Sequence, residues 1–284
     1  MAVLGGRRRK TKENREAAER SVWKFLLVFC LILIFLFPLY WMFSNGLKTN
    51  KDITAYPPVF VFKPTLNNIT GLFAQNDFLE FLKNSVIIAF GATVIGLVVG
   101  LPAAYAIVRL NRPGLSHLIV SVRMIPFIAF LIPWFLIFKV TGISGTHVAL
   151  ILTHIVITLP VLIWIMIGFF EDVPISLEEA ATIDGCTPFG VFLLVVLPLV
   201  KPGIIAGTIL SIIYSWNNFM FALVLGGPST KTLPVAIYNF MTYGQIDWAG
   251  LSAAAAMITL PVLIFAVFIQ RYFTKALARS GVKG

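Results

Sequence analysis

The sequence predicts an all-α fold, a polytopic membrane protein with six transmembrane helices. Two compositional observations support this: 58% of the 284 residues are hydrophobic and only 12% are charged, with a mean hydropathy of +0.92. Soluble domains contain about 25% charged residues, and a soluble fold of this length could not bury so much apolar surface. Disorder is excluded as well, because disordered chains combine low hydropathy with high charge.

Six long apolar segments are the third observation. A bilayer core about 30 Å thick needs roughly 20 apolar residues to be crossed by a helix. None of the 12 Asp and Glu residues lies inside these segments. The predicted spans are about 22–43, 85–108, 118–138, 147–170, 203–226 and 249–270. A further apolar segment, 185–200, is too short and too close to the next span to cross, so we interpret it as interfacial or re-entrant.

The basic residues predict the orientation of the spans. With six spans both termini lie on one side, and the segments on that side carry more than twice as many Lys and Arg residues as those on the other. The positive-inside rule then places both termini in the cytoplasm. Residues 1–21 are predicted as a basic cytoplasmic arm that attracts anionic membrane lipid, and 22–284 as the transmembrane domain. In this context the net charge of +10 sets orientation and does not indicate nucleic-acid binding.

Several chemistries have no signal in the sequence. There is no G-x-x-x-x-G-K-[ST] phosphate loop and no nucleophile–base–acid constellation, so the chain is not predicted to be an enzyme. His117, His147 and His154 lack ligand-like spacing, so no metal site is predicted. The lack of acidic residues in the spans disfavours a secondary carrier, although unwound backbone can bind sodium without carboxylates. Arg123, inside the third predicted span, either snorkels to the cytoplasmic surface or faces a pore or a partner.

The fourth connection carries strong local signals. Ser176 and Glu179 have the spacing of a capping box. Gly185 fits the left-handed position that stops a helix, and Thr187-Pro188 fits an N-cap followed by proline at the first helical position. These signals predict a short helix at about 176–186, a sharp glycine turn, and a second apolar helix that Pro198 bends.

A two-turn helix is not stable alone in water, so the short helix must dock on something. Ala180 and Ala181 would let a partner approach closely, and Glu178, Glu179 and Asp184 supply charge for a basic partner. The alternative is that the segment packs on its own chain as a solvated loop.

The same loop carries a family signature. Glu179-Ala180-Ala181, Gly185, Val195 and Leu197-Pro198 have a spacing that resembles the E-A-A…G…I-x-L-P signature of ABC importer permeases, with Val195 in place of isoleucine. In that family the loop is a coupling helix that docks in a cleft of a separate ATPase subunit. The resemblance implies that ATP and Mg²⁺ bind to that ATPase and that this chain holds no cofactor. The implied ATPase-coupling residues are Glu178, Glu179, Ala180, Ala181, Asp184 and Gly185.

Flanking segments look like the carbohydrate branch of that family, of the maltose and glycerol-phosphate permease type. They are Pro57-Pro58 with Lys63-Pro64-Thr65-Leu66-Asn67-Asn68, Ser215-Trp216-Asn217-Asn218-Phe219, Lys231-Thr232-Leu233-Pro234-Val235, and the tail from Gln270. The resemblance implies a subunit of a binding-protein-dependent sugar importer in a bacterial or archaeal cytoplasmic membrane. The implied partners are a second, non-identical permease subunit, two ATPase subunits or domains, and an extracytoplasmic sugar-binding protein. An importer of a non-sugar solute is the alternative, followed by a secondary carrier.

A polar stripe in the fifth predicted span is the candidate substrate pathway. Ser211, Tyr214, Ser215 and Asn218 recur at three- and four-residue spacing and would share one helix face. A polar stripe in an uncharged span faces protein or water. It therefore either lines a pore and contacts sugar, or forms hydrogen bonds between helices or with the partner permease.

Overall fold

The computed structural model describes residues 2–75, 77–242 and 245–280, and side chains within 23–74, 77–241 and 246–270. This part of the chain is helical apart from two short antiparallel strands, β1 (Met241–Thr242) and β2 (Gln245–Ile246). The all-α prediction is confirmed at this level. The side chains of the predicted basic arm and of the tail beyond 270 lie outside the described residues.

Four helices are long and apolar enough to cross a membrane by themselves. They are Trp23–Gly46 within α1 (Ala2–Gly46), α4 (Phe78–Arg109), α7 (His147–Glu171), and Trp248–Gln270 within α14 (Trp248–Ser280). Two bent helix pairs also qualify if each pair counts as one span. Within the described residues there are thus four to six candidate spans.

The third predicted span, 118–138, is not one straight helix. α5 (Pro113–Val122) ends before η1 (Phe127–Phe130) and α6 (Leu131–Thr141), and the two parts meet at 83°. Pro126 has no N–H to donate and biases the residue before it away from helical geometry, so α5 stops ahead of it. Arg123 is the C-cap of α5, and its guanidinium lies 5.3 Å from the ring centroid of Trp164 in α7.

The fifth predicted span, 203–226, is interrupted too. α11 (Lys201–Trp216) and α12 (Met220–Leu225) are separated at Asn217–Phe219. Oδ1 of Asn218 accepts a hydrogen bond from the Phe221 amide at 3.2 Å, which satisfies one of the free N–H groups that begin α12. Asn side chains favour such turns over a continuing helix. Three short helices follow: η3 (Pro228–Thr230), α13 (Leu233–Ala236) and η4 (Ile237–Phe240).

The connection between α7 and α11 has the predicted helix, glycine turn and second helix. It contains α8 (Ile175–Ile183), α9 (Pro188–Gly190), the π-helix η2 (Val191–Val196) and α10 (Leu197–Leu199). Two details of the prediction were wrong. α8 begins directly after Pro174, its N-cap, so Ser176 and Glu179 do not form a capping box. The chain bends by 79° between Leu199 and Lys201, not at Pro198.

The π-helix explains why Pro198 does not bend the chain. In an α-helix the proline ring would clash with the carbonyl of Leu194, four residues earlier. The wider turn of η2 directly before Pro198 changes that pairing, and α10 continues through the proline.

The chain forms two compact units, Met1–Ile69 with Asp247–Ala256, and Thr70–Ile246 with Met257–Gly284. In the first unit, α1 is followed by α2 (Asn50–Ile53) and a loop that leads to α3 (Asn67–Gln75). Lys48 is buried there: its Nζ donates to Asn45 Oδ1 at 3.2 Å and lies 4.3 Å from the Trp41 ring centroid. The amide and the aromatic face replace the water that the ammonium group loses.

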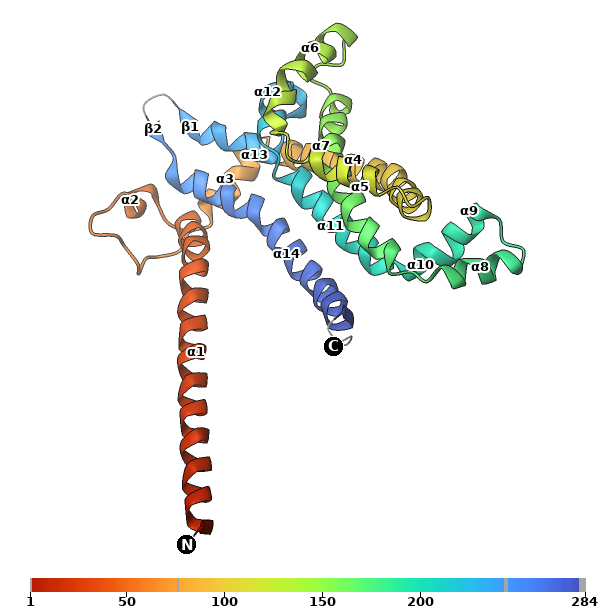
Figure 1. Cartoon of the computed structure of the whole chain (residues 1–284). Helices are drawn as coiled ribbons and strands as arrows, with labels where there is room; N and C mark the ends of the chain where they lie inside the picture. The colour runs from red at the N-terminus through yellow and green to blue at the C-terminus, as the bar shows by residue number, and fades with distance from the viewer. Residues whose placement is uncertain (1, 76, 243–244, 281–284) are drawn as a thin grey trace. The chain divides into compact units, whose positions relative to one another are not determined.

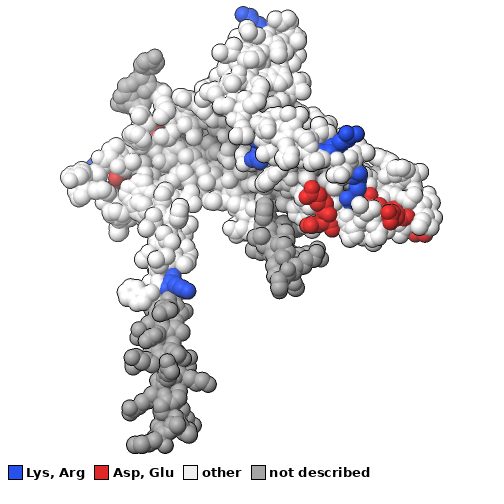
Figure 2. Space-filling model, in the orientation of Figure 1, with Lys and Arg blue, Asp and Glu red and all other residues white. Residues whose placement is uncertain are grey.

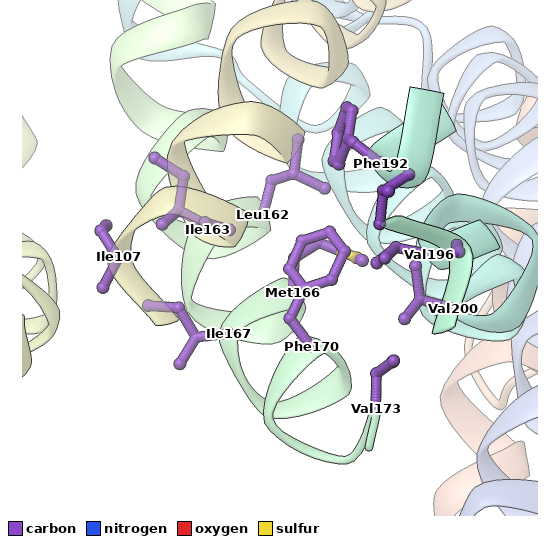
Figure 3. Close-up of a cluster of buried hydrophobic side chains, with 13 residues drawn as sticks. Ile107, Leu162, Ile163, Met166, Ile167, Phe170, Val173, Phe192, Val196 and Val200 are labelled. Atoms are coloured by element: carbon purple, nitrogen blue, oxygen red, sulfur yellow. The ribbon is translucent and has the colours of Figure 1, made fainter. Parts of the chain in front are cut away.

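The second unit is built on α4 and α7, which pack against each other, with α11 against both (Figure 1). Its core cluster combines side chains of α4, α7 and η2, with Met166 and Phe170 at its centre (Figure 3). Gly203 allows α11 to approach α7 closely, since a Cβ at that position would overlap the ring of Phe169. This packing fixes the base from which α8 projects.

Candidate functional site

α8 lies at one end of the second unit, where it projects with α9 beyond α10 (Figure 1). Its C-terminal end is fixed by a Schellman motif: the Cys186 amide donates to Ala181 O and the Gly185 amide to Thr182 O, both at 3.0 Å. Gly185 has a φ of +88°, which glycine adopts without the Cβ penalty. The helix therefore stops at a defined residue.

The helix after the turn also has a defined start. Thr187 is its N-cap, and Oγ1 of Thr187 accepts a hydrogen bond from the Gly190 amide at 3.1 Å. Pro188 occupies the first helical position, where the missing N–H has no cost. Both predicted cap signals on this side of Gly185 are confirmed.

One side of α8 rests on its own chain and the other is open. Ala181 is buried in the core cluster, and Cys186 packs against that cluster. On the open side Glu179, Ala180, Asp184 and Gly185 are exposed. Large apolar side chains are exposed next to them, namely Leu177, Ile183 and Phe189. Figure 2 shows acidic side chains gathered over this end of the unit. A surface of apolar, small and acidic residues suits a partner with an apolar cleft and basic groups.

Glu178 is turned toward its own chain, unlike its neighbour Glu179. Tyr105 donates its hydroxyl to Oε2 of Glu178 at 2.6 Å, and Nε of Arg109 donates to Oε1 at 2.7 Å. Nη2 of Arg109 forms an ion pair with Oε1 at 2.5 Å and also donates to Val173 O at 3.1 Å. The structure thus separates Glu178 from the acidic residues with which the sequence analysis grouped it.

Sequence reasoning missed this contact, although part of its signal is visible. Tyr105 and Arg109 are four residues apart, so they share one face at the end of a predicted span. The predicted topology places them on the same side of the membrane as the loop after 170, which contains several carboxylates. Spacing alone does not say which carboxylate they bind.

The four residues of the polar stripe in the fifth predicted span lie in different environments. Ser211 and Ser215 are buried, whereas Tyr214 is 45% exposed. Ser215 Oγ lies 2.6 Å from Nδ1 of His154 in α7, a contact that sequence reasoning also missed. Asn218 lies beyond the end of α11, and its Oδ1 accepts a hydrogen bond from the Phe221 amide in α12. The structure buries both serines, with Ser215 against α7, and leaves Tyr214 on an exposed side of the helix.

The long apolar helices and the two bent helix pairs place the chain in the class of helical membrane proteins. The chain belongs to the family of binding-protein-dependent transport system inner membrane components, whose model matches residues 93–279. That range includes α8, the Schellman turn and the clustered core.

Two relatives and one solved structure extend this result. The chain is 37% identical to the trehalose transport system permease protein of Mycobacterium tuberculosis, covering 88% of this chain and 93% of the relative. It is 35% identical to the sulfoquinovosyl glycerol transport system permease protein of Agrobacterium fabrum, covering 92% and 93%. A bacterial ABC transporter that imports the acidic polysaccharide alginate shares the fold, with a TM-score of 0.77 and 22% identity over 89% of this chain and 96% of that one.

Proposed function

We propose that the chain is the permease subunit of an ATP-driven, binding-protein-dependent sugar importer and forms half of its translocation pathway. The carrying observation is the exposed α8, which ends at Gly185 and bears the Glu179-Ala180-Ala181 signature. The relatives named for trehalose and sulfoquinovosyl glycerol transport favour a sugar as the solute. ATP is hydrolysed on a separate ATPase subunit, because this sequence has no phosphate loop.

α8 is proposed as the coupling helix that docks on this ATPase subunit. The exposed Glu179 and Asp184 would meet basic groups of the ATPase, and Ile183 with 86% exposure would fill an apolar part of its cleft. Ala180 leaves room for close approach. Ala181 and Gly185 contribute indirectly. Ala181 packs on the core cluster, and Gly185 forms the turn that ends the helix.

The proposed pathway runs past the interruption between α11 and α12. Non-helical backbone at membrane depth is tolerated where it is buried in protein or lines a water-filled cavity. Tyr214 and Asn217 are exposed beside this interruption, and Asn218 is partly buried within it. These side chains are the candidates for sugar contact, whereas Ser211 and Ser215 are candidates for packing within the chain.

A second permease subunit is proposed to cover the apolar helices that this chain leaves open. Within its own compact unit, the apolar window in Trp23–Gly46 of α1 is not buried. We propose six spans, with each bent pair counted as one, and both termini in the cytoplasm, as the distribution of Lys and Arg favours. In intact cells that carry the Cys30→Ser, Lys231→Cys variant, an external thiol reagent should label position 231 and leave Cys186 unlabelled. External labelling of Cys186 would contradict this topology.

Reconstitution tests the function. Proteoliposomes should contain the chain with its partner permease, ATPase subunit and binding protein, and they should be offered trehalose, other disaccharides and amino acids as separate solutes. Uptake of a sugar is expected only with ATP and the ATPase subunit present. Sugar uptake by the chain without ATP would instead identify a secondary carrier, and uptake of amino acids alone would identify a non-sugar importer.

A further inference from the structure

We infer that Tyr105 and Arg109 of α4, together with Glu178 of α8, form a link that makes α4 follow the movement of α8. We call these three residues the α4–α8 clamp. The inference rests on the proposed docking of an ATPase on α8 and names the positioning residues through which that docking reaches the spans.

The clamp joins four elements through few side chains. Glu178 receives hydrogen bonds from Tyr105 and Arg109, and Arg109 also binds the carbonyl of Val173 between α7 and α8. The ring of Tyr105 lies 5.0 Å from that of Phe192 in η2 and 5.6 Å from that of Phe170 in α7, measured between centroids. A displacement of α8 would therefore act on α4, α7 and η2 through the same small group of contacts.

The chemistry of the clamp suits the transmission of movement. Apolar contacts are non-directional, so the contact of Ala181 with the core would let α8 slide. Charge-assisted hydrogen bonds to both carboxylate oxygens fix direction as well as distance. The side chains of Arg109 and Glu178 are only 17% and 12% exposed, so water competes little for these bonds.

Within α8, the clamp involves Glu178 and not its neighbour Glu179. Among the described hydrogen bonds, those of Glu178 are the ones that join a side chain of α8 to another helix. Glu179, the next residue, is exposed and faces away. The two neighbouring glutamates thus have different tasks, with Glu179 available to the ATPase and Glu178 committed to α4.

α4 is placed to pass the movement on. Its end bears Tyr105 and Arg109, and the rest of the helix packs along α7 and against α11. Closely packed interiors transmit displacement because they have few voids to absorb it. The clamp therefore connects the exposed end of the unit to the helices that are proposed to line the pathway.

The test compares three variants of the clamp with one variant of the residue beside it. Glu178→Gln removes the charge that Arg109 binds and keeps the shape. Tyr105→Phe removes only the hydroxyl, so it keeps the ring contacts and protects the test against a folding defect. The charge exchange Glu178→Arg with Arg109→Glu restores a pair of opposite charges. Glu179→Gln is the matched control, since it makes the same chemical change one residue away on the exposed side.

Each variant is purified with the full importer, and three quantities are measured: ATPase subunit bound per permease, ATP hydrolysed, and sugar taken up per ATP. We expect Glu178→Gln and Tyr105→Phe to retain the ATPase subunit but to lower uptake per ATP by about two- to thirty-fold, the range of typical coupling changes. The charge exchange should recover part of this loss. Glu179→Gln should instead lower the amount of ATPase subunit bound per permease.

Two results would overturn the clamp and leave the proposed function intact: normal uptake per ATP in both Glu178→Gln and Tyr105→Phe, or loss of the ATPase subunit in Glu178→Gln to the same degree as in Glu179→Gln. In the second case Glu178 would be a docking residue. The proposed function itself would fail if Glu179→Gln and removal of α8 both left the ATPase subunit fully bound.

Discussion

α7 and α8 are neighbours in the chain, and the structure holds them in very different ways. α7 has buried residues along most of its length, with Met166 and Phe170 fully enclosed. α8 has one buried residue, Ala181, and is otherwise held by the Schellman turn and by Glu178. α7 is thus stabilised by packing over a whole face, whereas α8 is held at a few points and leaves its other face free. The free face of a helix held in this way is available for binding to a second protein.

The largest expected effect tests the packed side of this comparison. Met166→Ala should destabilise the chain by about 2–5 kcal/mol, because it removes a fully buried side chain from the core cluster and leaves a cavity. Thermal unfolding in detergent measures the loss. Ile183→Ala in α8 is the control: its side chain is 86% exposed, so stability should change by no more than about 0.5 kcal/mol. Equal destabilisation by both substitutions would contradict the view that α7 is stabilised by packing and that Ile183 of α8 is not.

The next effect tests the turn that ends α8. Gly185→Val forces a β-branched residue into a positive φ, at a cost of about 1–2 kcal/mol or more. The helix would extend through position 185 and displace Glu179 and Ala180, so less ATPase subunit should co-purify and transport should fall with it. Insertion of the spans should remain normal. Glu179→Ala should give a milder defect of the same kind.

Gly168→Val is a matched control for the turn. Gly168 lies within α7 without a positive φ, and nothing approaches the position that its Cβ would occupy. It should leave ATPase docking unchanged. If Gly185→Val kept the full complement of ATPase and lost transport, the loop would transmit movement without anchoring the partner. If it kept both, α8 would not be a coupling helix.

The end of α8 could be predicted from the sequence because caps are local. Gly185, Thr187 and Pro188 determine the turn through their own backbone preferences, and the structure places them in these roles. The start of α8 was predicted less well, because Pro174 takes the N-cap that Ser176 was expected to provide.

The interruptions of the spans could not be predicted in the same way. Pro102, Pro160 and Pro261 lie inside continuous helices, whereas Pro126 follows a break. The same residue type is thus compatible with both outcomes, and tertiary packing decides between them. The partner of Glu178 is set by the fold as well, since Arg109 lies 69 residues away in the sequence.

The smallest expected effect concerns the interruption after α11, where the polar stripe divides. Tyr214→Phe and Asn218→Ala should each lower sugar transport several-fold without loss of assembly, because a hydrogen bond contributes about 0.5–1.5 kcal/mol net. Ser215→Ala sharpens the comparison: it removes the partner of His154 in the interior, so it should lower the unfolding temperature more than transport by the assembled complex. Initial uptake rates and unfolding temperatures of the three variants separate these two effects. If Tyr214→Phe and Asn218→Ala both transport at the normal rate, the residues at this interruption serve packing within the chain, the role proposed for the two buried serines.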